Sequence, residues 1–146
     1  MAVQLTQEEA NRLIDMVKSS LIEQLVAPGR RERVEFDVQG ESKKDLFSVS
    51  IFRGRINAKR VNYNARIKMN GTVLLELHVN PTNRHMNPDG KLITGSHWHL
   101  YREGYGLQFA FPADDLSDLS FTENTIAFLK RFNVIKRPEI VEQIEI

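Results

Sequence analysis

The sequence contains no cysteine, which excludes a disulfide framework, thiolate zinc sites and cysteine nucleophiles. It has no apolar run approaching the roughly 20 residues of a membrane span, and no basic segment followed by an apolar core at its start. An excess of charge is also missing, because 20 Lys and Arg stand against 19 Asp and Glu. This balance argues against a non-specific nucleic-acid binder and against a nucleic-acid mimic. We expect a soluble, cytoplasmic protein with no membrane partner.

Several familiar catalytic motifs are absent as well. The sequence has no Gly-rich phosphate loop with Lys-Ser/Thr, no Gly-x-Ser-x-Gly elbow and no His-Glu-x-x-His pair. No motif specifies a cofactor. Internal repeats and low-complexity segments are missing too, and 146 residues suit one domain of ordinary size, so we expect a single domain over residues 1–146.

Hydrophobic periodicity predicts an α+β fold. Two segments, residues 5–26 and residues 119–132, have apolar residues at helical spacing. Each has a capping box near its start, which begins at Thr6 in the first segment and at Ser120 in the second. Alternation of apolar and polar residues predicts strands at 33–38, 46–52, 60–69, 72–79, 96–101 and 107–111. Residues 134–146 are expected to form a short edge strand or a docked tail. The predicted architecture is an antiparallel sheet of about five to seven strands, with an N-terminal and a C-terminal helix packed on one face.

The turn at Asn70-Gly71 fixes the expected register of the hairpin around it. A two-residue loop would mix the apolar and polar faces of the two strands, so we predict a three-residue loop, 69–71, with Gly71 in the left-handed conformation. That loop pairs Ile67 with Val73, Ala65 with Leu75 and Tyr63 with Leu77. It places Leu74, Glu76 and His78 on the outer, mostly polar face.

The stretch from Arg84 to Tyr105 holds most of the residues with catalytic potential, including three of the four histidines. In a strand over 96–101, alternation puts His97, His99 and Tyr101 on one face and Trp98 and Leu100 on the other. We expect the histidine face to be exposed and the Trp98 face to be buried. Upstream, Asn87-Pro88-Asp89-Gly90 has the residues of a type I turn, which can fold Arg84 and His85 back toward the histidine strand.

One interpretation of this stretch is a divalent metal site. His97-x-His99 on a strand presents two imidazoles to the same side, close enough to share one ion. His85 or His78 is a candidate third ligand, and an oxygen ligand is available from Glu76, Asp89 or Glu103. The spacing matches no diagnostic metal motif, so the metal ligands stay open among these candidates.

A second interpretation is metal-free acid–base cleavage of RNA, as in small endoribonuclease toxins. Histidine can accept a proton from a 2′-hydroxyl and donate one to the leaving oxygen near neutral pH. The candidate catalytic residues are His85, His97, His99 and Tyr101. The candidate substrate-binding residues are Arg84, Arg102 and Tyr105, which supply positive charge and a ring that stacks on an unpaired base.

A third interpretation is non-catalytic. The same stretch also suits a polar outer sheet face with a structural role. Because Tyr, Trp and Arg are common at binding surfaces, it equally suits a module that binds a host or phage protein, as a defence inhibitor or a toxin–antitoxin partner. The three interpretations predict different partners, namely a metal ion, RNA and a protein.

Several motifs together resemble an uncharacterised family of small bacterial and mobile-element proteins. They are the early helix at 5–10, Asn87-Pro88-Asp89-Gly90, Gly95-x-His97-x-His99-x-Tyr101, Tyr105-Gly106 and Phe132-Asn133-Val134. The resemblance implies a single-domain cytoplasmic protein from a phage, defence or toxin–antitoxin locus. It brings no established activity, so it assigns no catalytic role to any residue.

Overall fold

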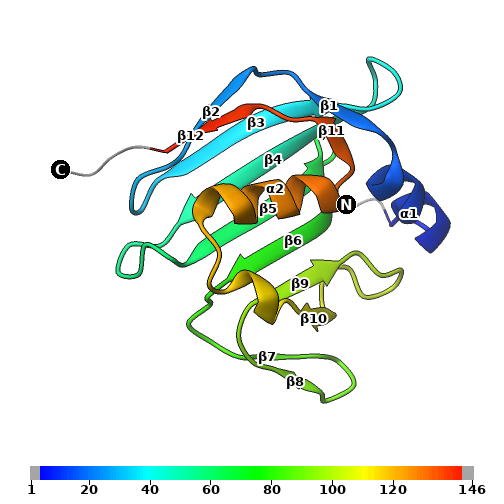
Figure 1. Cartoon of the computed structure of the whole chain (residues 1–146). Helices are drawn as coiled ribbons and strands as arrows, with labels where there is room; N and C mark the ends of the chain where they lie inside the picture. The colour runs from blue at the N-terminus through cyan, green and yellow to red at the C-terminus, as the bar shows by residue number, and fades with distance from the viewer. Residues whose placement is uncertain (1–3, 143–146) are drawn as a thin grey trace.

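An eight-stranded sheet forms the body of the protein in the computed structural model, which describes residues 4–142 (Figure 1). In spatial order the strands are β10 (Ala110–Pro112), β9 (His97–Leu100), β6 (Val73–Val79), β5 (Val61–Ile67), β4 (Leu46–Arg53), β3 (Arg33–Gln39), β1 (Lys18–Ser20) and β11 (Val134–Lys136). All neighbours in this sheet are antiparallel except β1 and β11, which are parallel. The prediction of an α+β fold with an antiparallel sheet is confirmed, and the sheet has eight strands where about five to seven were expected.

Two small sheets flank the main one. Strand β2 (Gln24–Val26) pairs in parallel with β12 (Glu139–Val141), and β7 (His85–Met86) pairs antiparallel with β8 (Leu92–Ile93). The predicted tail therefore provides two strands, β11 and β12, and its last four residues lie outside the described range.

Helix α2 (Phe121–Arg131) lies across one face of the large sheet, and α1 (Gln7–Asp15) lies beside one end of it (Figure 1). Both predicted capping boxes are present, Thr6 with Glu9 and Ser120 with Glu123. A 3₁₀ turn, η1 (Asp114–Leu116), precedes α2.

The core lies between α2 and the sheet. Phe128 of α2 stacks on Tyr63 of β5 with ring centroids 5.2 Å apart, and on Trp98 of β9 at 6.1 Å. Phe47 of β4 meets Phe132 edge-on at 5.4 Å. The side chains of Phe47, Tyr63, Phe128 and Phe132 are at most 1% exposed, and each contributes about 1.5–3 kcal/mol by leaving water.

The predicted N-terminal helix over 5–26 is wrong in its second half. The helix ends at Asp15, and the chain continues as β1 and β2. Val17 and Leu21, which lie in the apolar repeat that suggested a longer helix, are 50% and 54% exposed. Strand β1 instead inserts between β3 and β11, so pairing with residues far along the chain outweighs the local helical periodicity.

The hairpin between β5 and β6 is confirmed in part. Gly71 has a φ of 74°, and Ala65 faces Leu75 as predicted. The loop is four residues long, 68–71, because the Ile67 N–H donates to the Thr72 carbonyl. Strand β6 has one residue more than β5 between the pairs Arg66–Val73 and Ala65–Leu75. That residue is Leu74, which forms a bulge and is fully buried rather than on the outer face.

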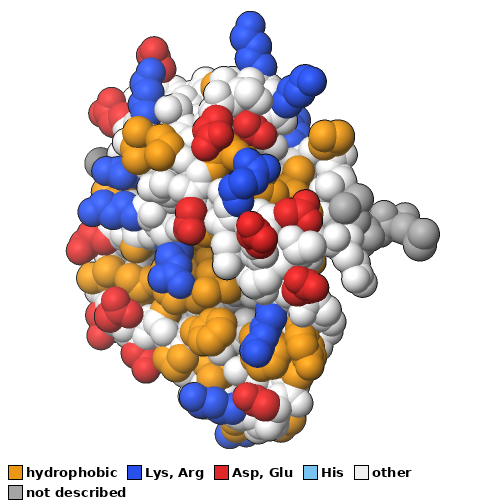
Figure 2. All heavy atoms as spheres, turned by 90° about the vertical axis from the view of Figure 1, so that its right-hand side faces the viewer, with side chains coloured by type: hydrophobic (Ala, Val, Ile, Leu, Met, Phe, Trp, Pro, Cys, Tyr) orange, Lys and Arg blue, Asp and Glu red, His pale blue; other side chains and the backbone are white. Residues whose placement is uncertain are grey.

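The surface beside α1 mixes charges of both signs with hydrophobic side chains, and no histidine is seen on it (Figure 2). No helix within residues 4–142 is long and apolar enough to cross a membrane.

Candidate metal centre

All four histidines of the chain meet in one cluster. His78 comes from β6, His85 from β7, and His97 and His99 from β9. Neighbouring rings in this group have centroids 4.7 to 5.8 Å apart. The cluster therefore joins two adjacent strands of the large sheet to the small β7–β8 hairpin.

The fold brings the four rings together in two ways. In the β6–β9 ladder His78 is the cross-strand partner of His97, and Glu76 is the partner of His99. The predicted turn at 87–90 forms, with the Gly90 N–H donating to the Asn87 carbonyl at 2.8 Å. The Asn87 side chain accepts from the Ala110 N–H and donates to its carbonyl, which fixes the hairpin against β10.

The histidines are buried, so the prediction that they form an exposed face is wrong. His97 is 2% exposed and His99 is 6% exposed. The predicted separation of His97 and His99 from Trp98 and Leu100 is correct, and the latter two pack against the hydrophobic core while staying only partly buried. The placement of Tyr101 on the histidine face is wrong, because Tyr101 belongs to the core cluster. The face with His97 and His99 is covered because the segment carrying His85 folds back over it.

Hydrogen bonds set which nitrogen of each ring carries a proton. Nδ1 of His97 lies 2.9 Å from the Gly95 carbonyl oxygen, and Nδ1 of His99 lies 2.6 Å from that of Leu107. A carbonyl only accepts, so both Nδ1 atoms are donors and Nε2 carries the free lone pair in the neutral ring. This second-shell arrangement is the usual one for a histidine that binds a metal.

The other two histidines are held in the same manner. Nε2 of His78 lies 3.0 Å from a carboxylate oxygen of Glu76, and Nε2 of His85 lies 2.7 Å from the Gln108 carbonyl. Both rings therefore donate through Nε2, which leaves their Nδ1 lone pairs free.

Burial keeps the two central rings neutral. Desolvation lowers the pKa of His97, and a hydrogen bond to Gly95 opposes the shift only in part. Desolvation and the neighbouring His78 lower the pKa of His99 to about 4. A neutral imidazole is the form that binds a metal, so both rings are ready as ligands at pH 7.

Three of the histidines are close enough to share one ion. His78, His97 and His99 each bring a ring nitrogen within 4.8 Å of the others, and His85 lies outside this group of three. An ion with Zn–N bonds of about 2.0–2.1 Å in a tetrahedral site needs nitrogens roughly 3.3 Å apart. Rotation of the three side chains that moves each nitrogen by about 1 Å or less satisfies that requirement. We refer to His78, His97 and His99 as the histidine trio.

Three of the other predicted site residues lie away from the trio. The Tyr101 hydroxyl bonds both the N–H and the carbonyl of Leu5, and this side chain is buried. Arg102 lies over the Phe109 ring at 4.1 Å, and Tyr105 packs edge-on against the same ring at 5.1 Å.

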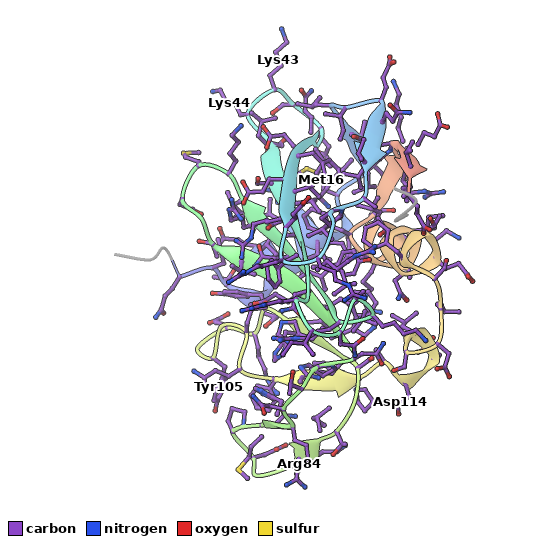
Figure 3. The ribbon with its side chains drawn as sticks, turned by 90° about the vertical axis from the view of Figure 1, so that its left-hand side faces the viewer. Met16, Lys43, Lys44, Arg84, Tyr105 and Asp114 are labelled. Atoms are coloured by element: carbon purple, nitrogen blue, oxygen red, sulfur yellow. The ribbon has the colours of Figure 1, made fainter. Side chains whose placement is uncertain are left out.

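Arg84 remains near the histidines. It lines the same pocket as the trio and lies at the lower tip of the molecule in Figure 3, on a different loop from Tyr105. The candidate oxygen ligands separate in the same way. Glu76 contacts His78, whereas Asp89 accepts from the Lys91 N–H and Glu103 accepts from the Gln7 N–H.

Sequence analysis misses Arg60, which precedes β5 and lines the pocket with the histidines. No local signal marks this residue, because it enters the pocket only through the β5–β6–β9 order of the sheet.

Comparison with known proteins gives one match, to a family of unknown function, DUF6978, over residues 5–134. No curated protein and no solved structure matches the chain. The matched region includes all four histidines and extends to the first residue of β11. Because the match covers most of the sequence, the chain belongs to the family of unknown function DUF6978.

Proposed function

We propose that this protein binds a divalent transition metal at the histidine trio and acts as a metal-dependent hydrolase. The observation that carries the proposal is the arrangement of three buried rings with their nitrogens within 4.8 Å. In two of them, His97 and His99, the second nitrogen is fixed by a backbone carbonyl. Rings that are neutral and held in this way can bind an ion through their free lone pairs without first losing a proton.

The ligand set favours zinc or a related ion. Imidazole nitrogens suit Zn²⁺, Cu²⁺, Ni²⁺ and Co²⁺, whereas Mg²⁺ and Ca²⁺ prefer oxygen. Three protein ligands leave one position of a tetrahedral ion open, as in catalytic rather than structural zinc sites. A metal there lowers the pKa of a bound water to near 7 and so supplies a nucleophile for hydrolysis.

His85 is the best-placed group for proton transfer beside the metal. Its ring lies 4.7 Å from that of His99, and it is only half-buried. Glu76 holds His78 and is the acidic residue in the pocket lining. We assign His85 the role of general acid or base and Glu76 the role of positioning His78.

The low pKa of His99 argues against its use as the general acid in metal-free cleavage. A general acid must be protonated near the working pH, and a pKa of about 4 leaves His99 neutral at pH 7. The ribonuclease function and the protein-binding function both stay predictions. A chelator distinguishes metal-free ribonuclease activity, which it would leave intact, from the metal-dependent reaction, which it would stop.

Metal titration tests the binding step. Metal-free protein titrated with Co²⁺ should give the visible absorption of a four-coordinate ion, and Zn²⁺ should raise the melting temperature by binding only the folded state. His97→Gln and His99→Gln should each weaken zinc binding by more than about 100-fold, since even outer-shell partners are worth 10–100-fold. His85→Gln is the matched control, because it changes a clustered histidine outside the trio.

Unchanged melting of the wild-type protein with zinc, or equal zinc affinity in His99→Gln and wild type, would contradict the metal site. For the catalytic step, turnover of a model phosphodiester should stop with chelator and return with zinc. RNA cleavage that persists in chelator and is lost in His97→Ala would support the ribonuclease hypothesis instead.

A further inference from the structure

The pocket above the histidine trio has a volume of about 310 Å³ and a lining rich in hydrogen-bond donors. Beyond the four histidines, its polar lining residues are Arg60, Asn62, Glu76, Thr82, Asn83 and Arg84. Two arginines thus stand against one carboxylate, and that carboxylate is already bound to His78. The pocket therefore favours an anion.

Arg60 is positioned by the backbone. Its N–H donates to the Asn57 carbonyl, and its carbonyl accepts from the Gly54 N–H at 2.7 Å. The side chain is half-buried, and its Nε atom is buried with no hydrogen-bond partner among residues 4–142. A buried donor without a partner is uncommon, so this guanidinium has hydrogen-bonding capacity that the described residues leave unused.

Arg84 is the second cation in the pocket lining. It lies one residue before His85 and is exposed. Within the described chain its side chain makes neither a hydrogen bond nor an ion pair with protein. Its guanidinium is therefore free to turn toward a ligand from the rim.

We propose that the pocket binds a phosphoryl group of the substrate, with Arg60 as the fixed anchor and Arg84 as the cation at the rim. This inference rests on the proposed metal site, and it names the substrate class of that site. The planar guanidinium fork of arginine matches two oxygens of a phosphate, and an ion held by the histidine trio would add positive charge beside them. The substrate is thus a phosphomonoester or a phosphodiester.

The chemistry of the step balances without an external reductant or oxidant. Water loses a proton to solvent and adds to phosphorus, the bond between phosphorus and the leaving oxygen breaks, and the alcohol departs with a proton that the protein donates and later regains from solvent. His85 is the group placed to deliver that proton. Arg60 touches the transferred group and stabilises its charge in the transition state.

Calorimetry with inorganic phosphate tests the anchor in zinc-loaded protein. Arg60→Gln should weaken phosphate binding by at least about tenfold and leave zinc affinity unchanged, because Arg60 is not a ligand. Arg60→Lys should restore only part of the affinity, since it keeps the charge and loses the fork. Arg55→Gln is the matched control, because Arg55 is exposed in the same loop and does not line the pocket.

Equal phosphate binding by Arg60→Gln and wild type would overturn the inference, as would the absence of phosphate binding by the wild type. If the wild type binds no zinc, the metal site fails by itself. In that case, phosphate binding by the metal-free wild type that is lost in metal-free Arg60→Gln would still support the anion pocket. Turnover of p-nitrophenyl phosphate would identify a phosphomonoesterase, whereas turnover of bis(p-nitrophenyl) phosphate or a short RNA would identify a phosphodiesterase. Arg60→Gln should lower the rate on whichever substrate is cleaved.

Discussion

Lys18 is a fully buried cation in the first strand of the sheet. Its Nζ donates to the carbonyls of Ile14, Met16 and Phe132 at 2.8 to 2.9 Å, and it lies 3.8 Å from the centroid of the Phe132 ring. These contacts satisfy carbonyls at the end of α1 and at the end of α2 together. The side chain therefore ties both helix termini to β1.

The first prediction concerns the pH dependence of stability at Lys18. Burial lowers its pKa from 10.5 to about 7, while Asp15 opposes the shift. Between these two values the unfolded chain binds more protons than the folded one, so the free energy of unfolding rises as pH increases from about 7 toward 10. The contribution of Lys18 changes by about 1.4 kcal/mol per pH unit at most.

Urea unfolding at pH 7, 8 and 9 measures this slope, with Lys18→Met as the reference that removes the titrating group. The wild type should gain stability relative to the variant over this range. Parallel curves for the two proteins would show that the three carbonyls keep the ammonium charged throughout.

At the scale of the element, the bulge in β6 is where strand pairing departs from simple alternation. Leu74 and Leu75 are consecutive and both fully buried, which a regular strand does not allow when one face is polar. The bulge turns Leu74 into the core and still leaves Glu76 and His78 opposite Asn64 and Asn62. It therefore sets the register that presents His78 to β9.

The second prediction follows from that burial. Leu74→Ala should lower the free energy of unfolding by about 2–5 kcal/mol, as expected for truncation of a fully buried leucine. The matched control is Met69→Ala in the preceding loop, where the side chain is 86% exposed and the change should be within about 0.5 kcal/mol. Chemical denaturation of both variants decides the matter, and a near-neutral Leu74→Ala would place that side chain on the surface.

The sequence predicts the elements with local signals and misses those that depend on distant partners. The capping boxes before α1 and α2 and the alternation of β3, β4, β5 and β6 are local, and they are confirmed. Strands β1, β2, β11 and β12 are three residues each and exist through pairing between the two ends of the chain. Residues 16–26 consequently keep a helical pattern of apolar residues and still form strands.

The candidate site shows the same limit at the level of the whole molecule. Alternation predicts that His97 and His99 share a face, and the turn at 87–90 brings His85 to them. Burial of the two rings depends on the covering segment, and Arg60 depends on sheet order. Sequence patterns therefore locate the histidines and Arg84 and miss both the enclosure of the rings and the presence of Arg60 in the pocket.

The third prediction tests what Tyr101 does across the molecule. Its hydroxyl bonds the backbone of Leu5, 96 residues away, at 2.9 Å in both directions. Tyr101→Phe leaves a buried N–H and carbonyl without that partner, so it should destabilise the fold by about 1–3 kcal/mol. Zinc and phosphate binding should be unchanged, because Tyr101 does not line the pocket with the trio.

Thermal melts and zinc titrations of Tyr101→Phe give both readouts on one sample. If the variant has wild-type stability and no longer binds zinc or phosphate, Tyr101 has the role at the histidine site that was predicted from the sequence.

The parallel pairing of β1 with β11 has a consequence for the order in which the protein forms during synthesis. Lys18 pairs with Val134, so one edge of the sheet stays open until nearly the whole chain has left the ribosome. The pairing of β1 with β3 and the hairpins from β3 to β6 need only sequence-local contacts, whereas the other edge of β1 must wait for β11, more than 100 residues later. A stalled nascent chain ending before β11 would thus carry a formed central meander with one edge of β1 and the strand β2 unpaired, a state open to chaperones and proteases.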